Sequence, residues 1–231
     1  MHERRQLDHL TRSDSEGLPH TFFRRDGDTD TLAVLFPGFG YRATMPLLHF
    51  AERSLLWRGI DVLRLDLVYD TDPAFSGADP AARRSRLRQD AERAVRAALG
   101  ERNYRRHVLV GKSLGTLALA DLIEGTFVER HPTCIWLTPL LSNEGLRRAV
   151  LRRRPPSFFA IGTADPLYEA AALQELMDAT GGRSVVVDRA DHSLEIAGDL
   201  RASLEALRAY GVGLEAFLDA SGFVAEGDRN G

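Results

Sequence analysis

The stretch that decides the fold is RRHVLVGKSLGTLALADLI, residues 105–123. Its first half is an apolar, β-branched run typical of a buried strand, and its second half has the composition of a buried helix. Between them stands GKSLG, residues 111–115, which predicts a tight turn from strand to helix. Such a turn has two possible functions. It is either a phosphate-binding loop with Lys112 on a nucleotide, or a G-x-S-x-G turn that presents Ser113 as a nucleophile.

The phosphate-binding loop is excluded by the residues before the turn. The pattern G-x-x-x-x-G-K-[ST] requires a glycine at position 106, where Arg106 stands, and no glycine occurs in residues 104–110. In the other pattern, the residues two before and two after the serine must be small, as Gly111 and Gly115 are. We therefore expect Ser113 on a strained turn, with its Oγ exposed at the strand end and the positive end of the next helix facing a developing oxyanion.

The rest of the chain repeats this alternation of strand and helix. Strand-like runs are found at residues 20–25, 31–38, 59–68, 107–111, 133–141, 157–163 and 184–190. Helical patterns are found at residues 43–57, from about 81 to 99, and at 114–125, 198–210 and 214–220, with one short helix within 142–156 and a loop at 69–80. This order predicts an α/β protein with a mostly parallel, doubly wound sheet of about seven strands and helices on both faces.

The domain organisation follows from the same pattern. Residues 1–17 are polar and aperiodic and are expected to form a flexible arm, and residues 18–231 a single domain. Because ligands of open α/β sheets bind beyond the carboxyl ends of the strands, the loops that follow each strand are the ones to search.

Two such loops carry an acid and a base. Asp165 follows the strand at 157–163, and His192 follows the strand at 184–190, which gives the chain order Ser, acid, His. Each also has a plainer interpretation. Asp165 precedes Pro166 and could cap a helix, and His192 could be an exposed loop residue or a helix cap. Glu144, after the preceding strand, is the substitute acid.

The loop PGFGYRATMP, residues 37–46, follows the strand at 31–38. Its Phe39 N–H, between two glycines, and the Leu114 N–H after the nucleophile are the expected donors to an oxyanion. The alternative is a simple Pro-Gly turn that ends the strand. Tyr41 and Tyr168 lie in loops flanking this site and are expected to line a substrate pocket.

Composition excludes several classes of function. A net charge of −3 and a pI near 6.2 give no reason to expect nucleic acid or an anionic membrane as partner, and no apolar run approaches the roughly 20 residues of a membrane span. The single cysteine, Cys134, is expected to be a small buried hydrophobe, which favours a cytoplasmic location. Lys112 is the only lysine beside 29 arginines, a bias that a GC-rich genome explains, and no mechanism is drawn from it.

These motifs together resemble the α/β-hydrolase family, from about Thr21 to Tyr210. The resemblance rests on GKSLG as the nucleophile turn, GTADP for the acid, DHSLE for the histidine and FPGFG for the oxyanion loop. It implies Ser113 as nucleophile, His192 as general base and acid, and Asp165 as the acid that orients it, with Phe39 and Leu114 as backbone donors. The small size is most similar to the compact, dienelactone-hydrolase-like branch.

Two departures from the family pattern bear on the substrate. Pro37 replaces the histidine that leads the HGGG-type oxyanion motif, and residues 142–156 leave room for one short helix but for no large lid. The five arginines of that segment (147, 148, 152, 153 and 154) could attract an anion, although a solvated basic face is the simpler interpretation.

The expected activity is hydrolysis of a small carboxylic ester or thioester through an acyl-enzyme, with a small-molecule substrate and no metal or organic cofactor. A non-catalytic binding protein of the same fold, or a peptidase or perhydrolase with the same three residues, is the alternative. The sequence leaves the acyl and leaving groups and the oligomeric state open.

Overall fold

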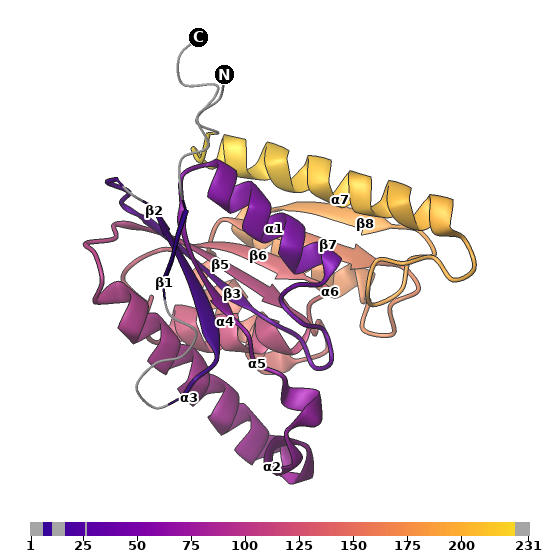
Figure 1. Cartoon of the computed structure of the whole chain (residues 1–231). Coiled ribbons are helices and arrows are strands. Elements are labelled where there is room, and N and C mark those ends of the chain that lie inside the picture. Colours follow the sequence, from indigo (N-terminus) through magenta and orange to yellow (C-terminus); the bar gives the residue numbers. More distant parts are fainter. Residues whose placement is uncertain (1–6, 11–16, 26, 225–231) are drawn as a thin grey trace.

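The computed structural model describes residues 7–10, 17–25 and 27–224. Their centre is one eight-stranded sheet in the order β1-β2-β4-β3-β5-β6-β7-β8 (Figure 1). The strands are β1 Leu7–Leu10, β2 His20–Arg25, β3 Thr31–Phe36, β4 Asp61–Leu65, β5 Arg106–Lys112, β6 Thr133–Leu137, β7 Ser157–Gly162 and β8 Arg183–Val187. Strands β3 to β8 are parallel, and β2 runs antiparallel to β4. The predicted mostly parallel sheet is thus confirmed.

The sheet has one strand more than predicted, because β1 lies inside the segment predicted to be a flexible arm. Its residues Leu7–Leu10 pair antiparallel with β2, with Leu7 opposite Arg25 and Leu10 opposite Phe22. The prediction of a flexible arm is therefore wrong for these four residues. The sequence LDHL has no apolar run typical of a strand, so the strand is recognised only from its pairing with β2. Residues 1–6 and 11–16 of the expected arm lie outside the described residues.

Helices cover both faces of the sheet (Figure 1). On one face α1 contacts α7, and on the other α3, α4, α5 and α6 pack in sequence against one another. Their bounds are α1 Pro46–Trp57, α2 Pro73–Gly77, α3 Pro80–Leu99, α4 Leu114–Glu124, α5 Glu144–Arg153, α6 Ala170–Thr180 and α7 Leu200–Ala220, with a 3-10 turn η1 at Tyr69–Thr71. The side chains of Asp79, Asn143 and Asp199 cap α3, α5 and α7, which fixes where these helices begin.

Three helix predictions differ from the structure. Helix α1 begins at Pro46 instead of residue 43, and the predicted loop at 69–80 contains η1 and α2. The two predicted C-terminal helices are one continuous helix, α7, which runs through Gly211 and Gly213. Gly213 is needed for packing, because a Cβ there would lie 2.5 Å from Cγ2 of Val185 on β8. The glycine therefore lets α7 approach the sheet and does not end the helix.

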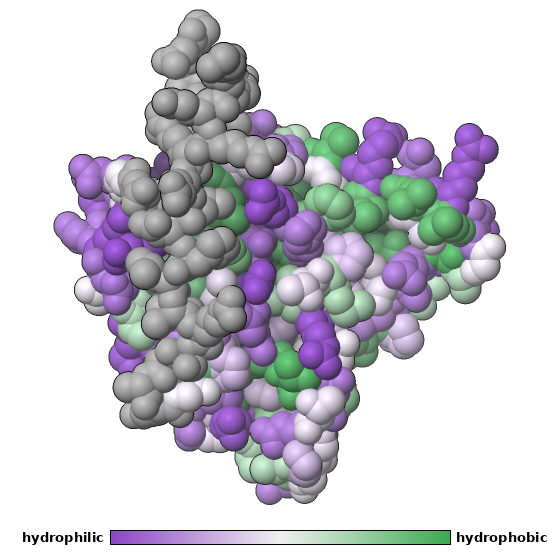
Figure 2. Space-filling model, in the orientation of Figure 1, coloured by the Kyte–Doolittle hydropathy of each residue, from purple (hydrophilic) through white to green (hydrophobic). Residues whose placement is uncertain are grey.

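The core forms one layer on each face of the sheet, and alternate residues of each strand enter opposite layers. Leu109, Trp136 and Phe159 pack on the side of α3 to α6, whereas their neighbours Val110, Leu137 and Phe158 pack on the side of α1 and α7. Cys134 is fully buried, as predicted, and burial raises the pKa of its thiol. On the face seen in Figure 2, apolar surface gathers among charged side chains over α7 and β8. Leu200, Leu204 and Val212 are exposed on that helix.

Candidate active site

Ser113 stands between β5 and α4 with φ 51° and ψ −115°, a backbone conformation that is strained for a residue with a side chain. The turn is tight because other backbone crosses it closely. A Cβ on Gly111 would lie 2.8 Å from the carbonyl oxygen of Gly115, and one on Gly115 would overlap the carbonyl oxygen of Phe36 at the end of β3. The Ser113 N–H donates to the carbonyl of Leu137 at 2.9 Å, which ties the turn to β6. The predicted strained turn is present.

Three side chains that are far apart in the sequence form one hydrogen-bonded row. His192 Nδ1 lies 2.7 Å from Asp165 Oδ2, and His192 Nε2 lies 2.7 Å from Ser113 Oγ. A carboxylate only accepts, so the Nδ1–H donates to Asp165 and leaves Nε2 free to accept the Ser113 hydroxyl. The structure thus brings the three predicted residues together in the arrangement that activates a serine.

The loop that carries His192 is pressed against the end of β7. Ala164 N–H donates to the carbonyl of Ala190 at 3.0 Å, and Thr163 N–H donates to Val187 at 2.9 Å. The carboxylate of Asp191 accepts the N–H groups of Ser193 and Glu195, so it shapes this loop from within. As expected for a sequence neighbour, Asp191 does not serve His192 Nδ1.

Asp165 is buried, with 3 % of its surface exposed. Its Oδ1 accepts the Leu167 N–H at 2.9 Å, while Oδ2 faces His192. The N-cap position of α6 is Glu169, four residues beyond Asp165, so Asp165 does not have the helix-capping role that was its alternative interpretation. Glu144, the substitute acid, is the first residue of α5.

The loop after β3, which the sequence predicts to hold an oxyanion donor, lies close to the turn that carries Ser113. A Cβ on Gly38 would stand 3.2 Å from the Lys112 carbonyl oxygen and 3.3 Å from Ser113 Cβ. The Gly38 N–H is already used, since it donates to the carbonyl of Tyr41 at 3.0 Å. Within the described residues, the amides of Phe39 and Leu114 donate to no protein acceptor, so both are available to an oxyanion.

The two tyrosines expected to line a pocket differ from each other. Tyr41 is only 6 % exposed, and its hydroxyl accepts the Leu47 N–H at the start of α1. Its side chain therefore points into the core, and the expectation that it lines a substrate pocket is wrong. Tyr168 is partly buried against the core layer on the side of α3 to α6, and its pocket-lining role stays a prediction.

Lys112, for which the sequence pattern predicts no role, has an unusual position in the structure. It is fully buried, and its Nζ has no hydrogen-bond partner among the described residues. The ammonium instead lies 4.6 Å from the centre of the Tyr41 ring. Burial lowers the pKa of Lys112 to about 7, although the nearby charges of Asp165 and Asp191 act in the opposite direction. The strand alternation of Val108, Val110 and Lys112 was the signal that could have placed it on the α1 and α7 side.

A single helix, α5, lies between β6 and β7. Phe39, in the loop after β3, is 52 % exposed. The arginines of α5 are largely engaged, because Arg147 pairs with Glu175 while Arg152 and Arg153 pair with Glu124. Because these arginines are already paired with carboxylates, the segment is better interpreted as a solvated basic surface than as a binding site for a substrate anion.

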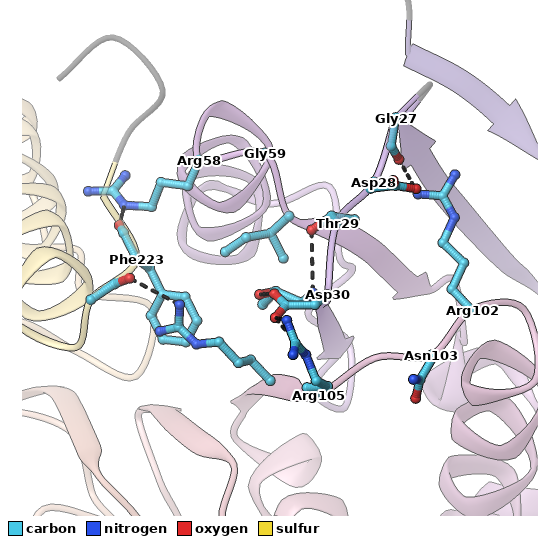
Figure 3. A pocket seen from close by; sticks show the side chains of 14 residues that line it. Gly27, Asp28, Thr29, Asp30, Arg58, Gly59, Arg102, Asn103, Arg105 and Phe223 are labelled. Atoms are coloured by element: carbon cyan, nitrogen blue, oxygen red, sulfur yellow. Dashed lines mark hydrogen bonds and ion pairs between the residues drawn. The ribbon is translucent and has the colours of Figure 1, made fainter. Parts of the chain in front are cut away.

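A pocket of about 780 Å³ lies at the opposite edge of the sheet, where β3, β4 and β5 begin (Figure 3). Its arginines are held by the protein itself. Arg58 donates to the carbonyl of Phe223, Arg102 to that of Gly27, and Arg105 to the carboxylate of Asp30. The pocket is remote from Ser113, because Ser113 follows the far end of β5. Its arginines bind other parts of the protein and so stabilise the fold.

Two further kinds of site are absent from the part of the chain that the structure describes. No three of the His, Cys, Asp and Glu side chains described by the structure are grouped as a metal site would require. Within the same residues, no helix is both long and apolar enough to cross a bilayer.

No family model and no curated protein matches the sequence, but many solved structures match the fold. An esterase from Pyrococcus furiosus is 13 % identical, with a TM-score of 0.64 over 93 % of this chain and 92 % of that one. A lidless serine hydrolase from Xanthomonas campestris is 16 % identical, with a TM-score of 0.63 over 94 % and 95 %. The esterase domain of a Rhodothermus marinus protein is 17 % identical, with a TM-score of 0.61 over 93 % and 98 %. With this topology and this likeness over nearly its whole length, the chain has the α/β-hydrolase fold.

Proposed function

We propose that this protein is a serine hydrolase that cleaves small carboxylic esters or thioesters through an acyl-enzyme on Ser113. The observation that carries the proposal is the row from Ser113 Oγ through His192 to Asp165, with both contacts at 2.7 Å. Hydrogen bonds of this length leave the serine hydroxyl with a base in place and the base with a fixed tautomer.

The reaction divides into two steps at the same atoms. Ser113 Oγ attacks the carbonyl carbon while His192 Nε2 takes its proton, and the buried carboxylate of Asp165 stabilises the imidazolium. The oxygen of the tetrahedral intermediate accepts from the amides of Phe39 and Leu114. The bond to the leaving group then breaks, and His192 gives the leaving group the proton. In the second step a water attacks the acyl carbonyl while His192 Nε2 takes its proton. The bond from the acyl carbon to Ser113 Oγ then breaks, Oγ regains the proton from His192, and the carboxylic acid leaves.

The surroundings of Ser113 favour a small acyl group. The single helix α5 stands where a lid would be inserted, so little protein is available to enclose a long chain. The similar proteins whose names include an activity are esterases and hydrolases, which supports ester over amide chemistry by analogy only. The alternatives remain a peptidase or a perhydrolase with the same residues, or a protein of this fold that binds a ligand without turning it over.

The test is labelling with a fluorophosphonate probe, which reacts with activated serines. The wild type is expected to label, whereas Ser113→Ala and His192→Ala are expected to lose the label and to keep their circular dichroism spectra. Ser184→Ala, which removes a serine hydroxyl on the edge strand β8, is the matched control and should label like the wild type. A folded wild type that stays unlabelled would favour the binding protein. A panel of short p-nitrophenyl esters, thioesters and peptide substrates then separates the remaining activities.

A further inference from the structure

Lys112 is the last residue of β5 and the immediate neighbour of Ser113. Its side chain shares the strand face of Val108 and Val110, which pack on the side of α1 and α7. The side chain is fully buried, and its Nζ meets no hydrogen-bond acceptor among the described residues. A buried ammonium is normally paired with an acceptor, because its desolvation is otherwise uncompensated. Lys112 therefore needs an explanation that ordinary packing does not supply.

The contact that the ammonium does make is with the face of Tyr41, at 4.6 Å from Nζ to the ring centre. A cation over an aromatic face is attracted by the ring quadrupole, and more strongly where water is absent. Tyr41 is fixed at two further points. Its hydroxyl accepts the Leu47 N–H at 3.0 Å, and its carbonyl accepts the Gly38 N–H at 3.0 Å. The ring thus joins the ammonium to the turn that contains Phe39.

That turn is in contact with the nucleophile. The space beside Gly38 is closed by Lys112 and Ser113, because a Cβ added at Gly38 would lie only 3.2 Å from the Lys112 carbonyl oxygen and 3.3 Å from Ser113 Cβ. A shift of Tyr41 would be transmitted through the hydrogen bond from Gly38 to the next amide, that of Phe39, which is one of the two oxyanion donors proposed above. Oxyanion donors act only when they are held at hydrogen-bond distance from the developing charge.

The charged groups around Lys112 come from the other loops of the site. Asp165, beyond β7, and Asp191, beyond β8, favour the charged form of Lys112, whereas burial lowers its pKa to about 7. The phenols of Tyr41 and Tyr210 stay neutral throughout the accessible range, because burial raises the pKa of each. Lys112 therefore changes charge near neutral pH, close to a carboxylate that is bonded to His192.

We propose that Lys112 is a positioning residue, whose buried ammonium on the Tyr41 ring holds the oxyanion turn of residues 38–41 against the nucleophile. This inference rests on the proposed function and adds a part to its machinery. On this proposal the ammonium affects turnover and fold stability in opposite directions. The ammonium aids turnover, but it destabilises the fold because it is buried without an acceptor.

The first experiment compares kinetics with stability in Lys112→Met, which keeps the length of the side chain and removes its charge. The expected result is a kcat about tenfold or more below the wild type, with KM nearly unchanged and a higher Tm. If Lys112 had only a structural role, the Lys112→Met substitution would lower Tm and leave kcat unchanged. Tyr41→Leu removes the ring and should lower kcat by a similar factor. The two substitutions together should cost little more than either alone, because both break the same contact. Additive effects would contradict the proposal.

The second experiment uses the fact that Lys112 is the only lysine. In protein labelled with ¹³C-lysine, a single side-chain Cε signal is expected, and Lys112→Met identifies it by its loss. Its titration midpoint is expected near pH 7 and should move once a fluorophosphonate has phosphonylated Ser113. A midpoint that phosphonylation leaves in place would overturn the proposal, because the ammonium would then be uncoupled from the site.

Failure of this inference and failure of the proposed function are distinguishable. A wild type that labels at Ser113, together with a Lys112→Met variant of full kcat, overturns the role of Lys112 and leaves the hydrolase standing. A wild type that no fluorophosphonate labels overturns the hydrolase, and with it the positioning role.

Discussion

The carbonyl oxygen of Ala190 lies directly against the Cα of Gly162, so closely that a Cβ at residue 162 would overlap it. Gly162 ends β7, and Ala190 belongs to the loop that carries His192. The same loop is bonded to β7 through the Ala164 N–H. The position of His192 therefore depends on a glycine at the end of β7, just as the turn at Ser113 depends on Gly111 and Gly115.

Gly162→Ala is expected to displace the His192 loop, because backbone cannot yield as a flexible side chain can. We expect fluorophosphonate labelling to slow by about 100-fold or more and stability to fall by about 1–3 kcal/mol. The measurements are the labelling rate and urea unfolding. Gly211→Ala, inside α7 where a Cβ meets nothing within 4 Å, is the control. It should label normally and gain about 0.5–1 kcal/mol. Wild-type labelling in Gly162→Ala would show that the close approach is not needed.

Asp165→Asn should nearly abolish turnover and leave the fold intact. The amide can present its NH₂ to His192 Nδ1, which favours the tautomer with the proton on Nε2, and that form cannot accept from Ser113. A loss of about 10³- to 10⁴-fold in kcat is expected. Glu144→Gln, at the first residue of α5, tests the substitute acid and should stay within about twofold of the wild type. If the two variants exchanged these outcomes, the assignment of the acid would fall to Glu144.

The candidate catalytic residues could be predicted from the sequence more fully than the strands, helices and side chains that surround them. Ser113, Asp165 and His192 each follow a strand of a parallel sheet, and that rule alone brings them to one edge. Strand β1 and the continuity of α7 could not be read from the chain, because pairing with β2 and packing on Val185 decide them. Tyr41 was misplaced for a similar reason. A tyrosine in a loop gives no sign of whether it turns outward or, as here, onto a buried lysine.

His107 on β5 makes the fold sensitive to acid. Its ring is buried against Phe127, both ring nitrogens lack hydrogen-bond partners among the described residues, and burial lowers its pKa to about 4. The folded state then binds fewer protons than the unfolded state between pH 6.5 and 4, so stability falls as the pH falls through this window. By pH 4.5 the loss attributable to His107 should be about 2 kcal/mol. Urea unfolding at pH 7 and 4.5 measures it, and His107→Leu should remove this part of the difference. An equal acid loss in both proteins would assign the effect to other groups.

The short connection between β6 and β7 predicts a flat dependence on acyl chain length. An acyl chain that enters a closed apolar pocket gains about 0.8 kcal/mol per methylene, or about fourfold in kcat/KM. Here α5 alone stands between β6 and β7, and the Phe39 side chain is itself half exposed, so a longer chain would lie on a wet surface. Along p-nitrophenyl acetate, butyrate, hexanoate and octanoate, kept below micelle-forming concentrations, kcat/KM should change by less than about twofold per two methylenes. Ser113→Ala supplies the background rate. A steep rise towards octanoate would mean that the chain is enclosed after all, and α5 would be the element to examine for movement.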